Sequence, residues 1–167
     1  MKDKRREEPQ ELITGDGVTI STLSDKLKNS PNDILNKIQS PERRTFPSSE
    51  RLQILAEASK RNTQLIYAQS SSDIVGYLLY IHMPGGLRIH KVCIAEGFRR
   101  QGIATRMIER VCDVAQKGGK HIDLWVDEGR KPASLCYIKC GFTQVGEAVV
   151  DYYGPGRNGI RMVWTFE

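Results

Sequence analysis

The sequence predicts one mixed α/β (α+β) domain, and three observations predict it. Apolar runs typical of strands alternate with amphipathic helical patterns, in the order β-α-α-β-β-β-α-β-α-β-β. Short turns join some of the strands and make antiparallel pairs, whereas helices join others and make parallel pairs, so the sheet is expected to be mixed. The 167 residues are about the length of one domain, and neither a repeat nor an interior linker divides them. We therefore predict a single domain over residues 11–167.

The first ten residues, MKDKRREEPQ, are mixed in charge and lack an apolar stretch. They are predicted to form a disordered, solvated tail and not a secretory signal. No apolar run approaches the ~20 residues of a membrane helix. A composition of 39% hydrophobic and 27% charged residues fits a globular protein with one core. We expect a cytoplasmic protein that does not bind membranes, with the nucleus as the alternative compartment.

The first half of the chain is predicted to hold a strand, two helices and a hairpin. GVTISTLS, residues 17–24, has loosely alternating apolar positions and predicts a strand. SPNDILNKIQS, residues 30–40, predicts a short helix that begins near Pro31. Residues 47–62 predict a second helix, which Ser48 or Ser49 would cap. TQLIYAQ and DIVGYLLYIH predict two strands joined as a hairpin by the turn SSSD.

The second half begins with a predicted strand over Leu87–Ile94. The helix after RRQG is predicted to bury one apolar stripe, made of Ala104, Met107, Ile108, Val111 and Ala115. HIDLWV predicts the next strand. KPASLCYIKCG predicts a helix, with Pro132 near its start and Gly141 just after its end. Residues 142–153 and 160–166 predict the last two strands.

The cysteines and histidines form no metal-binding pattern. Cys93, Cys112, Cys136 and Cys140 include no CxxC pair, and without a secretion signal we expect free thiols. The three histidines form neither HxxH nor HExxH, so we assign no metal. The net charge of +5 permits a polyanionic ligand, but the basic residues are spread along the chain. No nucleic-acid-binding module is recognised, so the sequence gives no support for nucleic acid as a partner.

Two glycine-containing loops are candidates for phosphate binding. GPGRNG, residues 154–159, matches the letters of a dinucleotide-binding fingerprint, but a strand follows it where that mechanism needs a helix. We predict a hairpin loop there. RRQGIA, residues 99–104, directly precedes a helix, whose first N–H groups are unpaired and attract phosphate. Taken alone, this loop fits an ordinary capped turn equally well.

The order of elements around RRQGIA resembles the GNAT superfamily of acyl-CoA-dependent N-acetyltransferases, from about Val18 to the C-terminus. Arg99, Gly102 and Ala104 match the family's phosphate signature Q/R-x-x-G-x-G/A. YIKCGF, from Tyr137 to Phe142, matches a second landmark, Y-x-x-x-G-F at the end of a helix. The resemblance implies a mostly antiparallel sheet flanked by helices, with acetyl-CoA as the acyl-donor cosubstrate.

The resemblance also implies which residues bind that cosubstrate. Main-chain groups of Val92, Cys93 and Ile94 would hold the acetyl group and the pantetheine arm, at a point where the family's fourth strand separates from its fifth. The pyrophosphate would lie on the following loop, made of Arg99, Arg100, Gln101, Gly102, Ile103, Ala104 and Thr105. Family members often carry an asparagine seven residues before the tyrosine. This chain has Arg130 there, a cation that we expect near the phosphates of CoA.

Tyr137 is the predicted general acid, because the departing thiolate needs a proton that a nearby phenol can donate. The family does not fix the general base at one position. Arg88 occupies one frequent base position and cannot serve, and Trp125 stands where the ribosomal-protein and N-terminal acetyltransferase branches carry glutamate or histidine. His90, two residues after Arg88 on the same strand face, is the candidate base. A structural strand histidine is the alternative.

Four residues are predicted to contact the acceptor. Tyr152 and Tyr153 resemble a tyrosine pair of the peptide-binding branches, although neighbours on a strand would face opposite sides, so only one would line a groove. Phe46 and Glu50 belong to the segment between the first two helices, which often closes over the acceptor in this family. For the tyrosines, a half-buried pair on an edge strand is the alternative.

Together these residues predict acetyl transfer from acetyl-CoA to a primary amine by direct attack. A peptide or protein amine is the leading acceptor, and a small arylalkylamine-like or polyamine-like amine is the close alternative. Two rival functions remain: a GNAT-fold module that binds acyl-CoA without catalysis, and an unrelated nucleotide-binding α/β domain. A monomer and a homodimer are both left open, since the last strand of such folds sometimes pairs across a dimer.

Overall fold

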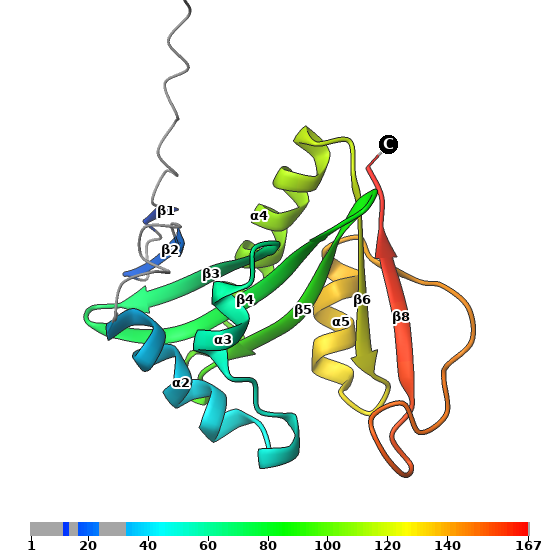
Figure 1. The fold of residues 1–167 in the computed structure, drawn as a ribbon, viewed down its shortest axis with the longest axis horizontal. Helices are drawn as coiled ribbons and strands as arrows, with labels where there is room; N and C mark the ends of the chain where they lie inside the picture. Colours follow the sequence, from blue (N-terminus) through cyan, green and yellow to red (C-terminus); the bar gives the residue numbers. More distant parts are fainter. Residues whose placement is uncertain (1–11, 14–16, 24–32, 167) are drawn as a thin grey trace, which may run out of the picture.

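The computed structural model describes residues 12–13, 17–23 and 33–166 (Figure 1). The predicted tail over residues 1–10 and the helix start predicted at Pro31 lie outside these residues. In the described part of the chain, no helix is long and apolar enough to cross a membrane.

The described strands form one sheet in the order β1-β2-β3-β4-β5-β6-β8-β7. Neighbouring strands are antiparallel except β5 and β6, which run parallel because a helical crossover connects them. This arrangement confirms the predicted mixed, mostly antiparallel sheet. The strands are β1 (Leu12–Ile13), β2 (Val18–Thr22), β3 (Thr63–Ser70), β4 (Asp73–Met83), β5 (Gly86–Ile94), β6 (His121–Asp127), β7 (Thr143–Gln144) and β8 (Gly159–Trp164).

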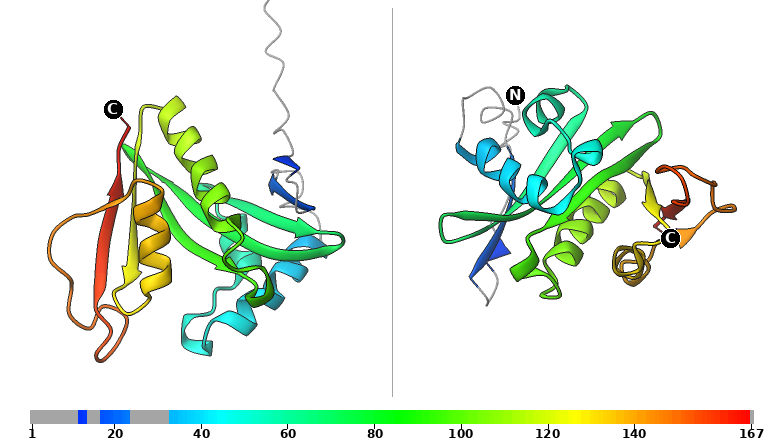
Figure 2. Two further views of the ribbon diagram at one scale, coloured as in Figure 1. Left: turned by 180° about the vertical axis from the view of Figure 1, so that it is seen from behind. Right: turned by 90° about the horizontal axis from the view of Figure 1, so that it is seen from below.

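Helices cover both faces of the sheet (Figures 1 and 2). Helices α2 (Asp33–Thr45) and α3 (Ile54–Ser59) lie on one face, where α2 packs on β4 and β5 and α3 packs on β3. Helices α4 (Ile103–Lys117) and α5 (Lys131–Lys139) lie on the opposite face. Two short 3-10 turns, η1 (Ser48–Glu50) and η2 (Glu96–Phe98), precede α3 and α4. Each face has its own buried apolar cluster, so the sheet separates two cores.

Helix α4 forms where its apolar stripe predicts it. Buried side chains recur every three or four residues, at Ile103, Met107, Ile108, Val111, Cys112 and Ala115. Ala104, predicted in the stripe, is only half-buried. Gly118 and Gly119 follow the last turn, and the φ of +62° at Gly119 is one that a side chain disfavours. The helix therefore ends at the predicted KGG.

The helix predicted over residues 47–62 is wrong in its first half. Residues 48–50 form only the turn η1, and the chain is extended at Arg51 before α3 begins at Ile54. Side chains from α2 bind this backbone, because the Leu52 N–H donates to Oε1 of Glu42 at 2.7 Å and the Leu52 carbonyl accepts from Gln39 at 3.0 Å. These bonds replace the helical ones. Conversely, α2 continues past its predicted end at Ser40 and includes Pro41.

The strand predicted over residues 142–153 is also largely wrong. Only β7 is regular, and one isolated bridge joins Val149 to Gly159. The chain leaves the sheet at Gly146, where φ is +76°, and turns again at Asp151, where φ is +56°. Tyr152 and Tyr153 therefore lie in a turn and not on a strand. The argument that neighbouring strand residues face opposite sides does not apply to them.

Candidate active site

Strands β5 and β6 are paired along only half of their length. Their parallel ladder joins Gly86–Ile89 to His121–Leu124 and then stops, and the two strands separate toward the bottom of Figure 1. The Ala95 N–H donates to the Val75 carbonyl of β4 at 2.8 Å. Backbone groups alternate along a strand, so those of Val92 and Ile94 turn away from β4 and toward the opening. Cys93 between them turns its backbone to β4, and its side chain is buried.

A β-bulge lies where the two strands separate. Leu79 of β4 pairs with Lys91, and Tyr80 pairs with Ile89, which leaves His90 as the extra residue of β5. The His90 side chain is exposed. The surrounding protein nevertheless desolvates the imidazole in part, and this lowers its pKa. The charge of Glu57 opposes the shift, and the nearby cations Lys91 and Lys60 add to it. An imidazole with a lowered pKa is neutral near pH 7 and able to accept a proton.

The loop predicted to bind pyrophosphate leads directly into α4. Gly102 is the N-cap with φ of +79°, and no side chain caps this end of the helix. Arg100 also has a positive φ, of 62°, and is exposed. Arg99 folds back, with its Nε donating to the Ile94 carbonyl at 3.0 Å. Its guanidinium thereby joins the loop to the open part of β5.

Tyr137 belongs to α5, on the sheet face that also carries α4. It is 8% exposed and lies edge-on against Phe142, with ring centroids 5.7 Å apart. Burial raises the pKa of its phenol far above the ordinary value, and Cys136 and Tyr153 add to this. The phenol is therefore protonated at every working pH, as a proton donor must be.

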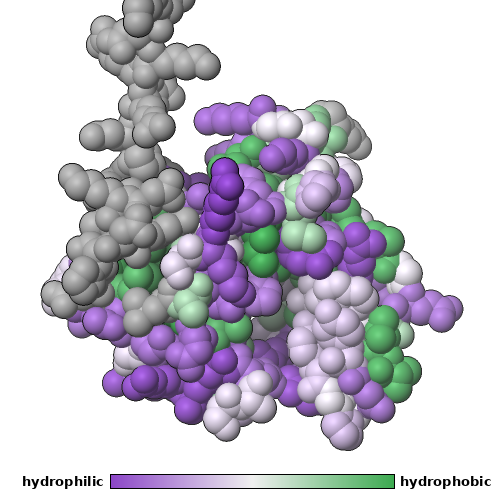
Figure 3. Space-filling model, in the orientation of Figure 1, coloured by the Kyte–Doolittle hydropathy of each residue, from purple (hydrophilic) through white to green (hydrophobic). Residues whose placement is uncertain are grey.

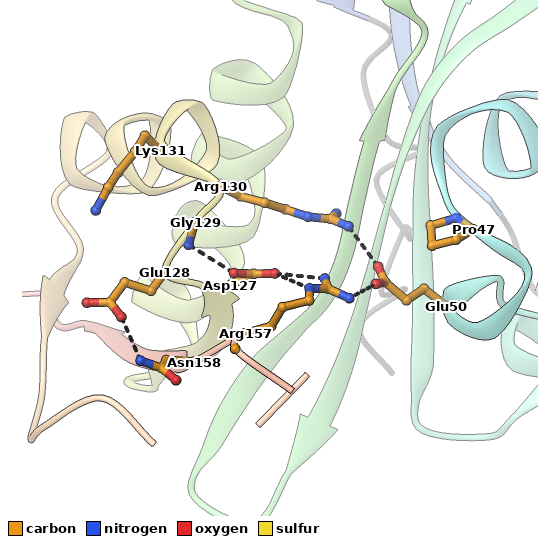
Figure 4. Close-up of a pocket in the computed structure, with 10 residues that line it drawn as sticks. Pro47, Glu50, Asp127, Glu128, Gly129, Arg130, Lys131, Arg157 and Asn158 are labelled. Carbon is orange, nitrogen blue, oxygen red and sulfur yellow. Dashed lines mark hydrogen bonds and ion pairs between the residues drawn. The ribbon is translucent and has the colours of Figure 1, made fainter. Parts of the chain in front are cut away.

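An ion-pair network joins three separate segments around an open hollow of about 680 Å³ (Figure 4). Glu50 of η1 pairs with Arg130 at 2.7 Å and with Arg157. Arg157, on the loop between β7 and β8, also pairs with Asp127 at the end of β6, at 2.7 Å. Partial burial alone would raise the pKa of Glu50, but the hydrogen bond from Arg157 and the charge of Arg130 hold it below its usual value. The network closes the lower end of the opening.

A buried carboxylate holds η1 against β5. Glu42 is fully buried, and Lys91 Nζ donates to its Oε1 at 2.6 Å while the Tyr77 hydroxyl donates to its Oε2. Lys91 also donates to the Glu50 carbonyl, and its Nζ lies 3.6 Å from the centre of the Phe46 ring. Phe46, predicted as an acceptor contact, is therefore covered by this cation and is 6% exposed.

The structure brings some of the predicted residues together. Val92 and Ile94 lie on the part of β5 that β6 does not pair, Arg99 of the following loop contacts Ile94, and Glu50 and Arg130 line the hollow. His90, Cys93, Phe46 and Tyr137 are not among the residues that line it. Glu50 and Arg130 contact each other. Tyr152 stacks on Trp125 of β6, and Tyr153 lies edge-on to Tyr152 at 4.9 Å.

Sequence reasoning missed the partners Glu42, Lys91 and Arg157, and it did not pair Asp127 with an arginine. Glu42 and Lys91 are 49 positions apart, and Glu50 and Arg157 are 107 apart. A lysine with a largely buried side chain needs a partner, but β5 also holds Arg88 and His90, so the sequence pattern does not single out Lys91. In the described part of the chain, no group of three or more His, Cys, Asp or Glu side chains could hold a metal ion.

Similar solved structures share this fold. The ribosomal-protein-S18-alanine N-acetyltransferase from Escherichia coli has a TM-score of 0.72 at 18% identity, covering 90% of this chain and 96% of the other. An aminoglycoside 6'-N-acetyltransferase complexed with coenzyme A has a TM-score of 0.73 at 21% identity, covering 87% and 96%.

Sequence comparison gives the family. An acetyltransferase of Agrobacterium fabrum is 25% identical over 108 residues, which are 65% of this chain and 74% of the relative. The model of the GNAT acetyltransferase family matches residues 32–142, from the start of α2 to Phe142 after α5. The matched region contains the half-paired strands, the loop before α4 and Tyr137. The chain belongs to the GNAT acetyltransferase family.

Proposed function

We propose that the chain transfers the acetyl group of acetyl-CoA to a primary amine, with a peptide or protein amine as the acceptor. The observation that carries the proposal is the separation of β5 from β6 after Ile89 and Leu124. It leaves the backbone groups of Val92 and Ile94 without a strand partner on that side. The amides of a pantetheine arm have the hydrogen-bonding groups to occupy that edge.

The loop before α4 fits the phosphates of acetyl-CoA. A Cβ placed on Gly102 would meet nothing within 4 Å, so the loop surface is open there. The first N–H groups of the 15-residue helix α4 have no side-chain cap, and exposed Arg100 adds a positive charge. Arg99 stabilises the loop through Ile94 and Arg130 lies on the other side of the opening, held by Glu50.

Acetyl-CoA supplies an acetyl thioester, and residues of the chain would move the protons and stabilise the developing charge. The neutral imidazole of His90, directly or through water, would accept the proton of the incoming ammonium. The amine would then attack the thioester carbonyl, whose developing negative charge the backbone N–H groups of β5 would stabilise. Collapse of the intermediate would break the C–S bond, and Tyr137 would donate its proton to the departing CoA thiolate. The proton that the new amide nitrogen loses would restore the phenol. The buried Cys93 thiol, whose pKa burial raises to about 11, is unsuited to forming a covalent intermediate.

The acceptor would enter from the face that carries Tyr152 and Tyr153. Both tyrosines come from one turn and contact each other, so they form a single aromatic wall beside the opening. Aromatic side chains with polar tips suit a peptide, whose backbone alternates polar and apolar groups.

The test has a binding step and a transfer step. Acetyl-CoA at 100 times its dissociation constant should stabilise the folded protein by ~2.7 kcal/mol, and ATP and NAD should not. Peptides with free N-termini should then gain an acetyl group, detected by mass spectrometry together with CoA release. Binding without any transfer would leave a non-catalytic acyl-CoA module, and no binding would remove the proposal.

A further inference from the structure

No helix covers one face of β6 and β8 (Figure 1), and the strand register places polar and aromatic residues on this face. Asp123 and Trp125 lie two residues apart on β6, and Arg161 of β8 is directly opposite Trp125. Arg88 of β5 is in register with Asp123, so it shares this face. The opposite face of the same strands holds Ile122, Leu124, Val126, Ile160 and Met162 in the core under α4 and α5. Figure 3 views the molecule from the side of the uncovered face.

The charges on this face do not balance. Arg88 donates to both carboxylate oxygens of Asp123, at 2.8 and 2.7 Å, and Arg161 donates to Oδ2 at 3.0 Å. Within the described residues, Asp123 is the one acidic side chain that pairs with either guanidinium. Asp123 is buried, whereas the two arginine side chains are 35% and 39% exposed. Two cations thus share one carboxylate, and most of their ten N–H donors are not used by it.

We propose that this pair, Arg88 and Arg161, binds an anionic group of the acceptor, so the acceptor is an amine that carries a carboxylate. The inference rests on the proposed function, because it names the acceptor class of the same site. Guanidinium forks match carboxylates in shape and charge, and Asp123 fixes both of them in position. The same excess of positive charge repels polycationic amines, which lie outside the acceptor class.

The distances fit a short acceptor. The last paired residues are Ile89 and Leu124, so Trp125 stands at the apex of the opening. Asp123, with its two arginines, is two residues back along β6, which is about 7 Å. Tyr152 covers Trp125 and lies beside this path. An amine at the opening with a carboxylate a few bonds away, such as an N-terminal residue followed by an acidic one, spans this distance.

The test compares two peptides with free N-termini that differ only in Glu or Gln at the second position. Calorimetric titration into CoA-saturated protein should show the Glu peptide binding about tenfold more tightly or better, since charge-assisted hydrogen bonds are the stronger kind. Arg161→Gln should abolish the difference, because it removes a guanidinium but leaves Asp123 paired with Arg88. Arg161→Lys should retain part of it. Lys117→Gln, which removes an exposed cation from the far end of α4, is the charge-matched control.

Equal affinities for the two peptides, no binding of either below millimolar concentration, or a preference that survives Arg161→Gln would each overturn the inference. The thermal stability of Arg161→Gln, with and without CoA, shows that the variant is folded. Failure of the proposed function looks different. If the proposed function fails, the Glu peptide still binds more tightly than the Gln peptide, but neither peptide is acetylated. If only this inference fails, the two peptides are acetylated equally well.

Discussion

Tyr152 lies flat against Trp125, with ring centroids 4.5 Å apart and ring planes inclined by only 10°. The stack depends on a glycine. A Cβ on Gly159 of β8 would lie 2.7 Å from Cγ of Tyr152, closer than real contacts allow. Tyr152 can therefore occupy this position only because Gly159 has no side chain.

Gly159→Ala should displace Tyr152 and lower kcat/KM for the acceptor by about tenfold or more, because small displacements in an active site are expensive. Acetyl-CoA binding should be unchanged. Steady-state kinetics with each substrate varied in turn checks both statements. Gly118→Ala, where the new methyl meets nothing closer than 3.5 Å, is the control. Unchanged acceptor kinetics in Gly159→Ala would separate Tyr152 from acceptor binding.

Tyr137→Phe should lower kcat by about tenfold to a hundredfold, because it removes the proton donor and keeps the ring that packs on Phe142. The melting temperature should stay close to that of the parent protein. Tyr67→Phe removes a hydroxyl from another tyrosine that is also 8% exposed, and it should leave kcat as it is. Equal kcat values for Tyr137→Phe and the parent would mean that water, and not Tyr137, protonates the CoA thiolate.

The lowered pKa of His90 makes the free energy of unfolding depend on pH, and the variant His90→Gln removes this contribution. The unfolded state binds a proton at the ordinary pKa near ~6.5, and the folded state binds it only at lower pH. The contribution of His90 to stability is therefore present above the unfolded pKa and is lost as pH falls toward the folded pKa. Urea unfolding at pH 8 and pH 5 should show a smaller loss of stability for His90→Gln than for the parent.

The same variant tests the catalytic role of His90. The acidic limb of kcat/KM should have its midpoint below the ordinary histidine pKa in the parent and should disappear in His90→Gln. A limb that persists unchanged in the variant would assign the base to another group. His121→Gln, a change of an exposed histidine at the far end of β6, is the matched control.

Glu50→Gln should loosen the closure at the lower end of the opening. Glu50 is paired with two partly exposed arginines, so we expect the free energy of unfolding to change by no more than about 1 kcal/mol. Amide hydrogen exchange should nevertheless accelerate in η1 and in the loop around Arg157. Added salt should reproduce part of this effect in the parent protein and a smaller part in the variant, where Arg157 still pairs with Asp127. Glu109→Gln on the exposed side of α4 is the control.

Among the four cysteines, Cys136 should react first with iodoacetamide at neutral pH. The hydrogen bond from Cys140 lowers the pKa of Cys136, whereas burial raises the pKa of Cys93 to about 11 and that of Cys112 to about 12. Thr105 of the cofactor loop lies 3.8 Å from the Cys136 sulfur, so acetyl-CoA should slow the labelling. Peptide mapping after brief alkylation identifies the modified residue. Labelling of Cys93 ahead of Cys136 would contradict the expected order.

The features that the sequence predicted are those encoded by local periodicity. The stripe from Ile103 to Ala115 defines α4, and the two apolar runs of β3 and β4, joined by a short polar turn, define their hairpin. The landmarks RRQGIA and YIKCGF are each contiguous, so the family could be recognised before any long-range contact was known.

The features that it did not predict depend on distant partners. Leu52 is extended because Glu42 and Gln39 of α2 bind its backbone, and no local pattern around Leu52 indicates that. The excess positive charge beside Asp123 arises because β5, β6 and β8 are adjacent, although Arg88 and Arg161 lie far apart in the sequence. Local propensity cannot report such contacts, because tertiary packing decides them.

Alternate residues of β6 lie on opposite faces of the sheet. Ile122, Leu124 and Val126 face the core, and Asp123, Trp125 and Asp127 face the opposite side, which is the proposed acceptor side. A substitution at Trp125 therefore replaces no core side chain, whereas Asp123 and Asp127 are buried and paired with arginines. Under the proposed function, acceptor preference could be redesigned in a small library through the alternate residues of one strand, without replacing the core residues of that strand.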